Sequence, residues 1–139
     1  MNEVQSAFGL LQLKYINGLI TKRKKIADLY RLKLQGIKGI KMLNEMEYLQ
    51  PNYPYFPIFI DKEEYGKSRD QLYDFLKTQN IFTRRYFYPL ISHLSTYKGL
   101  PSALPINLPI AEKAAQQVLC LPIYPDLGND TIEYICKII

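Results

Sequence analysis

The stretch NIFTRRYFYPLISH, residues 80–93, holds two adjacent arginines, a run of aromatic residues, a proline and the only histidine of the chain. Its first part alternates with period two, which predicts a β-strand over residues 81–88. One face of this strand would carry Phe82, Arg84, Tyr86 and Tyr88, and the other would carry Ile81, Thr83, Arg85 and Phe87. Each face would therefore present one guanidinium group among flat rings.

Such a strand has two interpretations, and both stay open on the residues alone. An arginine can hold a phosphate with two parallel hydrogen bonds, and a neighbouring tyrosine can stack on a base or a sugar, so the strand is a candidate nucleotide-type site. The alternative is an ordinary sheet strand, with aromatic rings that pack in a core and arginines that extend to water.

Helical signals lie on both sides of this stretch. Ser68 and Gln71 form a capping box at the start of a helix, and Asn80 suits the left-handed residue just past the end of that helix. Pro109 is placed for the first turn of another helix, over residues 110–117. A last helix is predicted to begin with Asn129 or Asp130 as its cap and to run to residue 139.

Short strands are predicted over residues 37–43, 53–60 and 118–123. Prolines at positions 51, 54 and 57 argue against a central strand over the whole of residues 53–60. Helices and short strands in irregular order predict an α+β fold in two layers.

The chain is predicted to open with a long helix. Asn2 and Gln5 form a capping box, and apolar residues follow at helical spacing. Asn17 and Gly18 predict either a kink or a break between two helices, and Gly36 is a natural stop. The basic run at residues 22–25 would spread around the helix, so it indicates a solvated face rather than a nucleic-acid site.

Composition limits the class of protein. The 139 residues suit one domain, and a net charge of +5 favours acidic ligands or partners without prescribing nucleic acid. Two cysteines make no disulfide framework, and neither a signal peptide nor a membrane-spanning apolar run is found, so we expect a cytoplasmic protein with no membrane partner. A lone histidine and scattered glycines give no metal site, catalytic triad or phosphate loop, so no catalytic residue and no metal ligand are assigned.

Three segments carry a resemblance to a known family. Residues 1–13 (MNEVQSAFGLLQL), 83–93 (TRRYFYPLISH) and 109–127 (PIAEKAAQQVLCLPIYPDL) resemble, in order and spacing, parts of the DegT/DnrJ/StrS family of pyridoxal-phosphate-dependent sugar aminotransferases. They are similar to the opening helix of that family's small domain, to a strand that runs into the substrate cleft, and to a closing helix, strand and Tyr-Pro turn. The ending YFYPLIS looks most like members that act on nucleotide-linked keto-deoxysugars.

This resemblance implies the small domain of a fold-type I aminotransferase, with a long N-terminal helix and a small, mostly antiparallel sheet on which helices pack. It implies that residues 1–139 are a single, C-terminal domain, without the large domain that carries the Schiff-base lysine. Pyridoxal phosphate is then expected in the parent enzyme, and none bound to this chain alone. The family reaction transfers an amino group from glutamate to a nucleotide-linked keto-deoxysugar, and this chain would supply only the substrate-side wall.

The resemblance also suggests roles for particular residues. Arg84 and Arg85 are candidates for contacts with the pyrophosphate or a carboxylate, and Tyr86, Tyr88 and His93 for contacts with the sugar or base. A regular strand cannot point both arginines into one cleft. We favour the face of Arg84, because Ile81 and Phe87 make the opposite face more core-like.

Family members work as dimers, so a homodimer is expected. The apolar side chains of the opening helix that would face the large domain, among them Phe8, Leu11 and Tyr15, should be partly exposed. Two other functions stay open: a stand-alone, non-catalytic module that binds sugar nucleotides or other ligands, and a basic nucleic-acid-binding or scaffold protein.

Overall fold

The structure is a computed structural model that describes residues 2–139. They form two compact units. The first contains the residues up to Gln35, Met46–Pro54 and Ile123–Ile139, and the second contains Gly36–Glu45 and Tyr55–Pro122. A long first helix and a small antiparallel sheet with helices packed on it confirm the predicted α+β fold. That residues 1–139 form a single domain stays a prediction.

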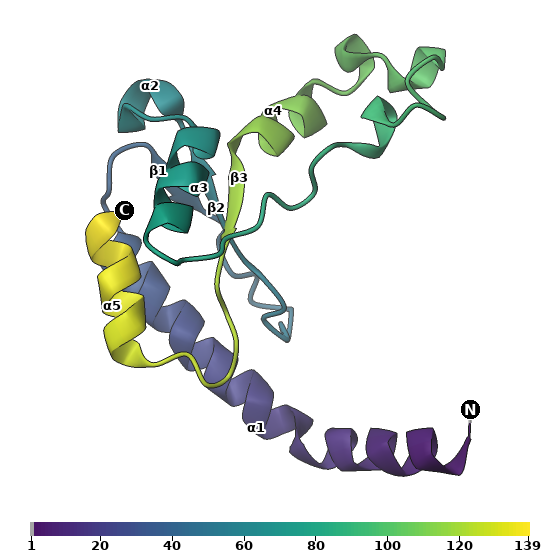
Figure 1. Cartoon of the computed structure of the whole chain (residues 1–139), viewed down its shortest axis with the longest axis vertical. Helices are drawn as coiled ribbons and strands as arrows, with labels where there is room; N and C mark the ends of the chain where they lie inside the picture. The colour runs from purple at the N-terminus through teal and green to yellow at the C-terminus, as the bar shows by residue number, and fades with distance from the viewer. Residues whose placement is uncertain (1) are drawn as a thin grey trace. The chain divides into compact units, whose positions relative to one another are not determined.

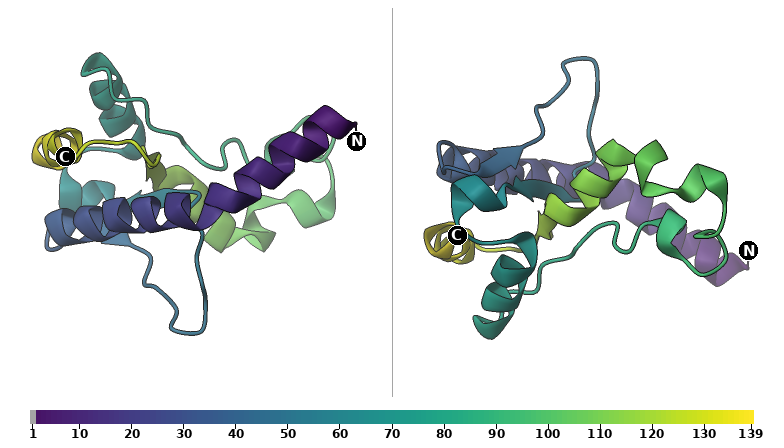
Figure 2. Two further views of the ribbon diagram at one scale, coloured as in Figure 1. Left: turned by 90° about the horizontal axis from the view of Figure 1, so that it is seen from below. Right: turned by 90° about the horizontal axis from the view of Figure 1, so that it is seen from above.

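Helix α1 (Glu3–Leu34) confirms the predicted opening helix and its capping box. The Asn2 side chain accepts a hydrogen bond from the Gln5 N–H at 2.9 Å, and the Gln5 side chain accepts one from the Asn2 N–H at 3.1 Å. The helix is continuous but changes direction along its length (Figure 1, Figure 2), so the predicted weak point is a kink and not a break. Close to it, the Thr21 hydroxyl donates to the Asn17 carbonyl at 2.9 Å, a bond of the kind that bends helices.

The C-terminal half of α1 packs beside the last helix, α5 (Asn129–Ile138), as Figure 1 shows. Ion pairs at the surface join Lys33 to Glu133 at 2.8 Å and Lys22 to Asp126 at 3.1 Å. Lys22 belongs to the basic run, so this part of the run is an ion-paired, solvated helix face, as predicted. The buried side chains of the two helices recur at helical spacing and are Ile26, Ala27, Tyr30, Leu34, Ile132 and Ile135.

The predicted cap of α5 is wrong. Gly128 occupies the N-cap position with an extended backbone, and no side chain makes a capping hydrogen bond. Asn129 and Asp130 cannot cap because they already lie inside the first turn. Glycine is tolerated at this position since it leaves the first N–H groups open to water.

None of the helices among residues 2–139 combines the length and the apolar character needed to cross a membrane.

The second unit is built on an antiparallel sheet, which within the described residues has three strands in the order β1 (Ile40–Met42), β2 (Phe56–Ile60) and β3 (Val118–Leu121). Each lies inside a predicted strand but is shorter than predicted. In the register, Ile58 of β2 pairs with Met42 of β1 and with Leu119 of β3.

Strand β2 is central although it contains Pro57. Pro57 lies opposite Cys120, and both backbone groups of Cys120 bond on the other edge of β3: its N–H donates to the Arg84 carbonyl at 2.7 Å, and its carbonyl accepts from the Arg84 N–H at 3.0 Å. Alternate pairs of an antiparallel ladder exchange no hydrogen bonds, so the missing N–H of Pro57 costs nothing on this side. The expectation that the prolines prevent a central strand over the whole of residues 53–60 is confirmed, because β2 begins only at Phe56.

Helices cover the sheet: α4 (Pro109–Gln117) packs on β2, and α3 (Arg69–Thr78) packs on β3. The capping box of α3 is confirmed, with the Gln71 N–H donating to the Ser68 hydroxyl at 3.2 Å and the Ser68 N–H donating to the Gln71 side chain at 2.8 Å. Asn80 has a φ of 59°, the predicted left-handed conformation. A single helical turn, α2 (Lys62–Tyr65), lies between β2 and α3.

The predicted strand over residues 81–88 is wrong. Among the described residues, its only β-bridge is that between Arg84 and Cys120. Buried and exposed side chains alternate only as far as Arg84, and Phe87, which was expected to be core-like, is 71% exposed. Strand β3 has four residues and uses its other edge for β2, so it offers the stretch only a short partner.

Candidate functional site

Arg84 combines a fixed backbone with an exposed side chain. Its two backbone hydrogen bonds to Cys120 hold it at the outer edge of β3, while the preceding residue, Thr83, is buried. The Arg84 guanidinium makes no ion pair or hydrogen bond with any of residues 2–139. An anchored positive charge of this kind is able to meet an anion.

Two tyrosines pair beside Arg84. The ring centres of Tyr55 and Tyr86 are 4.5 Å apart, and the Tyr55 hydroxyl donates to the Tyr86 hydroxyl at 3.0 Å. The hydrogen bond to Tyr86, with a smaller effect of burial, raises the pKa of Tyr55 above its ordinary value, although the charge of Arg84 acts to lower it. Because the Tyr86 oxygen accepts this bond, its own proton stays available to a further acceptor, such as a phosphate or sugar oxygen.

The Arg85 side chain interacts with other residues of the same unit. It donates to Asp70 at 3.0 Å, and its guanidinium lies 4.5 Å from the ring centre of Tyr73 and 5.0 Å from that of Tyr88. The hydrogen bond to Asp70 raises the pKa of Arg85 further above its ordinary value. The charge of Arg85 is therefore already matched by a carboxylate.

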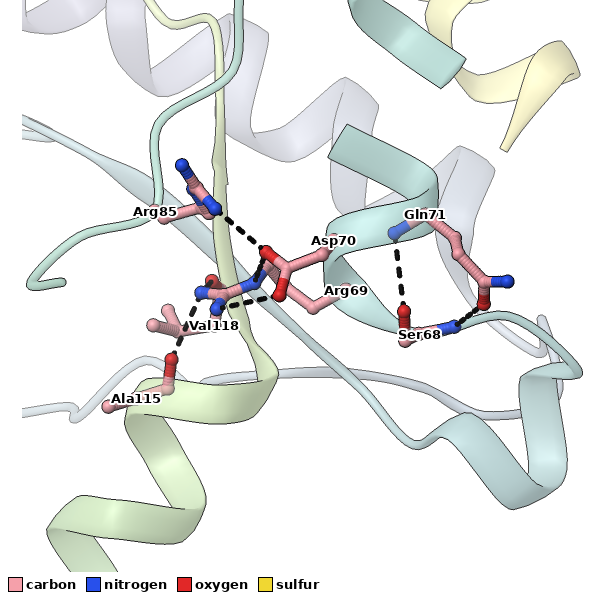
Figure 3. A network of polar contacts seen from close by, with 7 residues as sticks. All are labelled: Ser68, Arg69, Asp70, Gln71, Arg85, Ala115 and Val118. Atoms are coloured by element: carbon pink, nitrogen blue, oxygen red, sulfur yellow. Dashed lines mark hydrogen bonds and ion pairs between the residues drawn. The ribbon is translucent and has the colours of Figure 1, made fainter. Parts of the chain in front are cut away.

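Asp70 receives a second arginine (Figure 3). The Arg69 Nε lies 2.8 Å from an Asp70 carboxylate oxygen, and the Arg69 side chain is buried. Partial burial acts to raise the pKa of Asp70, but hydrogen bonds from Arg85 and Arg69 and their charges lower it below its ordinary value. This carboxylate is consequently ionised at neutral pH.

His93 lies in a short 3₁₀ turn, Ile91–His93, and faces α4. Its Nε2 is 2.7 Å from a carboxylate oxygen of Glu112, which is largely buried. The hydrogen bond attaches the turn to the first turn of α4. Among residues 2–139, His93 makes no hydrogen bond or ion pair with the tyrosines or arginines of the site.

An apolar hollow of about 220 Å³ lies under the aromatic residues. Its lining residues are Phe59, Tyr86, Phe87, Leu90, Ala111, Ala114, Ala115 and Val118. Tyr86 therefore lines this hollow and also bonds to Tyr55 through its hydroxyl. A ligand with one polar and one apolar side could contact both.

The structure divides the predicted site residues into separate groups. Tyr86 lies with Tyr55 near Arg84, Arg85 lies with Tyr88, and His93 is attached to α4. The predicted common face of Arg84, Tyr86 and Tyr88 is wrong for Tyr88, because the alternation ends before it.

Sequence reasoning missed the partners that organise these groups. Tyr55 lies inside the predicted strand over residues 53–60 without a signal that points to Tyr86, and no pattern singles out Arg69 or Asp70. The available signal for the latter two was their position: they follow the Ser68 cap directly, so they lie in the first turn of α3.

The residues at hand do not fit a pyridoxal-phosphate anchor. All lysines among residues 2–139 are exposed, whereas a Schiff-base lysine acts in an enclosed setting that lowers its pKa. Burial raises the pKa of the Cys120 thiol to about 11, so it is not a nucleophile at neutral pH. No group of three or more metal-ligating side chains gathers in the described part of the chain.

Comparison with known proteins gives the family. The sequence profile of the DegT/DnrJ/EryC1/StrS aminotransferase family matches residues 1–139. The chain belongs to this family. A dTDP-4-amino-4,6-dideoxy-D-glucose transaminase of Escherichia coli is 50% identical over all of this chain, which covers 37% of that protein. A protein of the same name from Shigella dysenteriae is 39% identical over the same shares.

Solved structures agree with this membership of the aminotransferase family. DesI, determined in the presence of its TDP-sugar product, superposes with a TM-score of 0.89 at 30% identity, over 99% of this chain and 34% of that protein. S. venezuelae DesV, in complex with a ketimine intermediate, superposes with a TM-score of 0.87 at 25% identity, over 99% of this chain and 35% of that protein. The chain thus spans little more than a third of the length of the relatives that it matches.

Proposed function

We propose that residues 1–139 are the C-terminal domain of a pyridoxal-phosphate-dependent aminotransferase that transfers an amino group from glutamate to a nucleotide-linked keto-deoxysugar. In this proposal the catalytic lysine and the cofactor belong to a part of the protein outside residues 1–139. The family match supports the aminotransferase, the share of the relatives' length supports a partial enzyme, and the exposure of all described lysines supports a cofactor anchor elsewhere.

The substrate class follows from the E. coli relative, which is named for a dTDP-linked 4-amino-4,6-dideoxy sugar. We propose a dTDP-linked 4-keto-6-deoxy sugar as the amino acceptor. The diphosphate of such a molecule needs cations, and its sugar needs hydrogen-bond donors and an apolar surface for the deoxy carbon. Arg84, the Tyr86 hydroxyl and the apolar hollow could supply these contacts.

The observation that carries the site is the exposed Arg84 side chain, which has no ion pair among residues 2–139, on an anchored backbone beside the Tyr55–Tyr86 pair. Arg84, Arg85, Tyr86, Tyr88 and His93 all remain candidates for substrate contact. Arg84 and Tyr86 come first among them, since one has an unmatched charge and the other has a proton to donate.

The test uses the whole protein in which these residues occur. Incubation with glutamate and a dTDP-linked 4-keto-6-deoxy sugar should yield the 4-amino sugar nucleotide, detected by mass spectrometry. Residues 1–139 alone, mixed with pyridoxal phosphate and reduced with borohydride, should give no stoichiometric adduct at a single lysine. Such an adduct would contradict the assignment of the cofactor to another part of the protein, and binding of the sugar nucleotide without amino transfer would favour a non-catalytic binding module.

We also propose that the protein is a homodimer, and that residues 1–139 on their own self-associate through the first half of α1, the surface that is expected to face the large domain. As expected, its apolar side chains are exposed: Val4, Phe8, Leu10, Leu11, Leu13 and Tyr15 are each more than half accessible. Val4, Phe8, Leu11 and Tyr15 follow a helical repeat and form one stripe, which is a surface suited to burial against an equivalent helix.

Replacement of Phe8 by Asp should weaken the self-association of residues 1–139 in light scattering, because it puts a charge in the middle of this stripe. Leu13→Asp, which puts the same charge at an exposed apolar residue on the opposite side of the helix, is the control. If residues 1–139 stay monomeric at high concentration, the self-association is overturned, and if Phe8→Asp leaves it unchanged, its interface lies elsewhere.

A further inference from the structure

The second unit contains a buried arginine that the proposed site does not use directly. The Arg69 side chain is 2% exposed, yet Arg69 stands at the first position of α3. Burial of a charged group is unfavourable unless hydrogen bonds and an opposite charge compensate it. The contacts of Arg69 therefore indicate what its burial achieves.

Arg69 joins several elements of the unit (Figure 3). One guanidinium nitrogen, Nη1, donates to the Ala115 carbonyl at 3.0 Å and to the Val118 carbonyl at 3.3 Å, at the point where α4 ends and β3 begins. The last carbonyls of a helix lack partners inside the helix and carry its negative dipole end, so a cation stabilises them. Arg69 therefore fastens the start of α3 to the junction of α4 and β3.

The same guanidinium also reaches the aromatic stretch. Its central carbon lies 4.9 Å from the ring centre of Tyr88, and that of Arg85 lies 5.0 Å from the same ring. Two cations thus share one ring. Their mutual repulsion is offset by Asp70, which contacts Arg69 at 2.8 Å and Arg85 at 3.0 Å.

We infer that Arg69, Asp70 and Arg85 form a positioning network that holds the stretch around Tyr88 in place, and through it the ligand-binding side chains Arg84 and Tyr86. The two adjacent arginines then have different roles: Arg84 contacts the ligand, and Arg85, paired with Asp70, helps to hold the stretch. The part of this inference that concerns the ligand rests on the proposed function. The part that concerns the conformation of the stretch is independent of it.

Asp70→Asn is the decisive variant, because it keeps the shape of the side chain and removes only the negative charge that compensates the positive charges of Arg69 and Arg85. Variants of Arg69 are less informative, since loss of a buried cation can unfold the unit. Arg85→Lys is a second test: it keeps the charge but loses the planar group that lies on Tyr73 and Tyr88. Asp74→Asn is the matched control, on the same helix and with no hydrogen bond or ion pair to the network among residues 2–139.

Amide hydrogen exchange, measured on the whole protein without ligand, reports on the conformation of the stretch directly. The amides of Arg84 and Cys120 are protected by their mutual hydrogen bonds, so loosening of the stretch should speed their exchange. We expect about tenfold faster exchange of these amides in Asp70→Asn and Arg85→Lys, and no change in Asp74→Asn. Unchanged exchange in Asp70→Asn would overturn the positioning network.

Sugar-nucleotide binding separates this inference from the proposed function. We expect Asp70→Asn to weaken binding about tenfold, to add nothing to Arg85→Ala, and to have a smaller effect in Arg84→Ala than in the wild type, because part of its effect passes through Arg84. If exchange rises but neither Asp70→Asn nor Arg84→Ala changes binding, the network stands and the proposed site falls. If Arg84→Ala weakens binding and Asp70→Asn changes neither exchange nor binding, the site stands and the network falls.

Discussion

Helix α3 and the stretch at residues 81–93 are neighbours in the chain and differ in what fixes them. Helix α3 has its cap, its buried face and its left-handed exit within a few residues of one another, at Ser68, Leu72, Leu76 and Asn80. The stretch that follows has one β-bridge and is otherwise held by side chains from α3, α4 and the residue before β2. A segment fixed by local signals can be predicted from its own sequence, whereas one fixed by distant partners cannot.

The largest effect on stability is expected from a substitution in the buried face of α3. Leu72 is fully buried, so Leu72→Ala should lower the free energy of unfolding by roughly 2–5 kcal/mol. The melting temperature and denaturant midpoint of the protein measure this. The control is Leu100→Ala, the same chemical change at an exposed leucine. Equal melting temperatures for the two variants would show that α3 is not part of the cooperative core.

A smaller effect, on function alone, is expected from Arg84→Ala. Loss of an exposed side chain should change stability by no more than about half a kcal/mol. Loss of a charge-assisted contact to phosphate, worth roughly 1.5–3 kcal/mol, should raise the KM for the sugar nucleotide about tenfold or more. The glutamate half-reaction should hardly change, because glutamate carries no phosphate.

Titration of the two half-reactions separately measures this difference, and Lys77→Ala supplies an exposed cation on α3 as the control. If Arg84→Ala impairs both half-reactions equally, or mainly unfolds the protein, Arg84 has a structural role. The ligand contact would then have to be sought among Arg85, Tyr88 and His93.

The local signal of α3 can be measured at its cap. Ser68→Ala removes the hydroxyl that accepts the Gln71 N–H and should cost about 1 kcal/mol of stability. Ser102→Ala, at an exposed serine in a short turn, should cost almost nothing. A loss no larger in Ser68→Ala than in Ser102→Ala would mean that tertiary packing alone fixes the start of α3.

The smallest expected effect is a loss of folding stability at low pH. The pKa of Asp70 is lowered in the folded protein, so its ion pairs stabilise the fold above the unfolded pKa of about 3.9, and this contribution is lost as the pH falls through the folded pKa. Because Asp70 is half exposed, the contribution should be about 0.2–1 kcal/mol.

Denaturant titrations at neutral pH and near pH 3 measure the loss. The gap in stability between wild type and Asp70→Asn should shrink at the lower pH, while the gap between wild type and Asp74→Asn should respond less. A gap for Asp70→Asn that stays constant would show that the carboxylate makes no net contribution.

The sequence by itself determined the elements that depend on neighbouring residues. The capping boxes at Asn2 and Ser68 and the left-handed Asn80 occur as predicted, because each needs only partners within four residues. It also determined the family and, through the alternation that holds up to Arg84, the exposure of that one side chain.

Only the tertiary structure decided what surrounds Arg84. The pairing of Tyr86 with Tyr55 spans 31 residues, and the contact of Arg85 with Asp70 spans 15, so neither leaves a periodic trace in the sequence. The end of the alternation after Arg84 depends on the length of β3 and on which of its edges is taken by β2. The sequence thus supplied two adjacent arginines, and packing left the side chain of Arg84 exposed and paired that of Arg85 with Asp70.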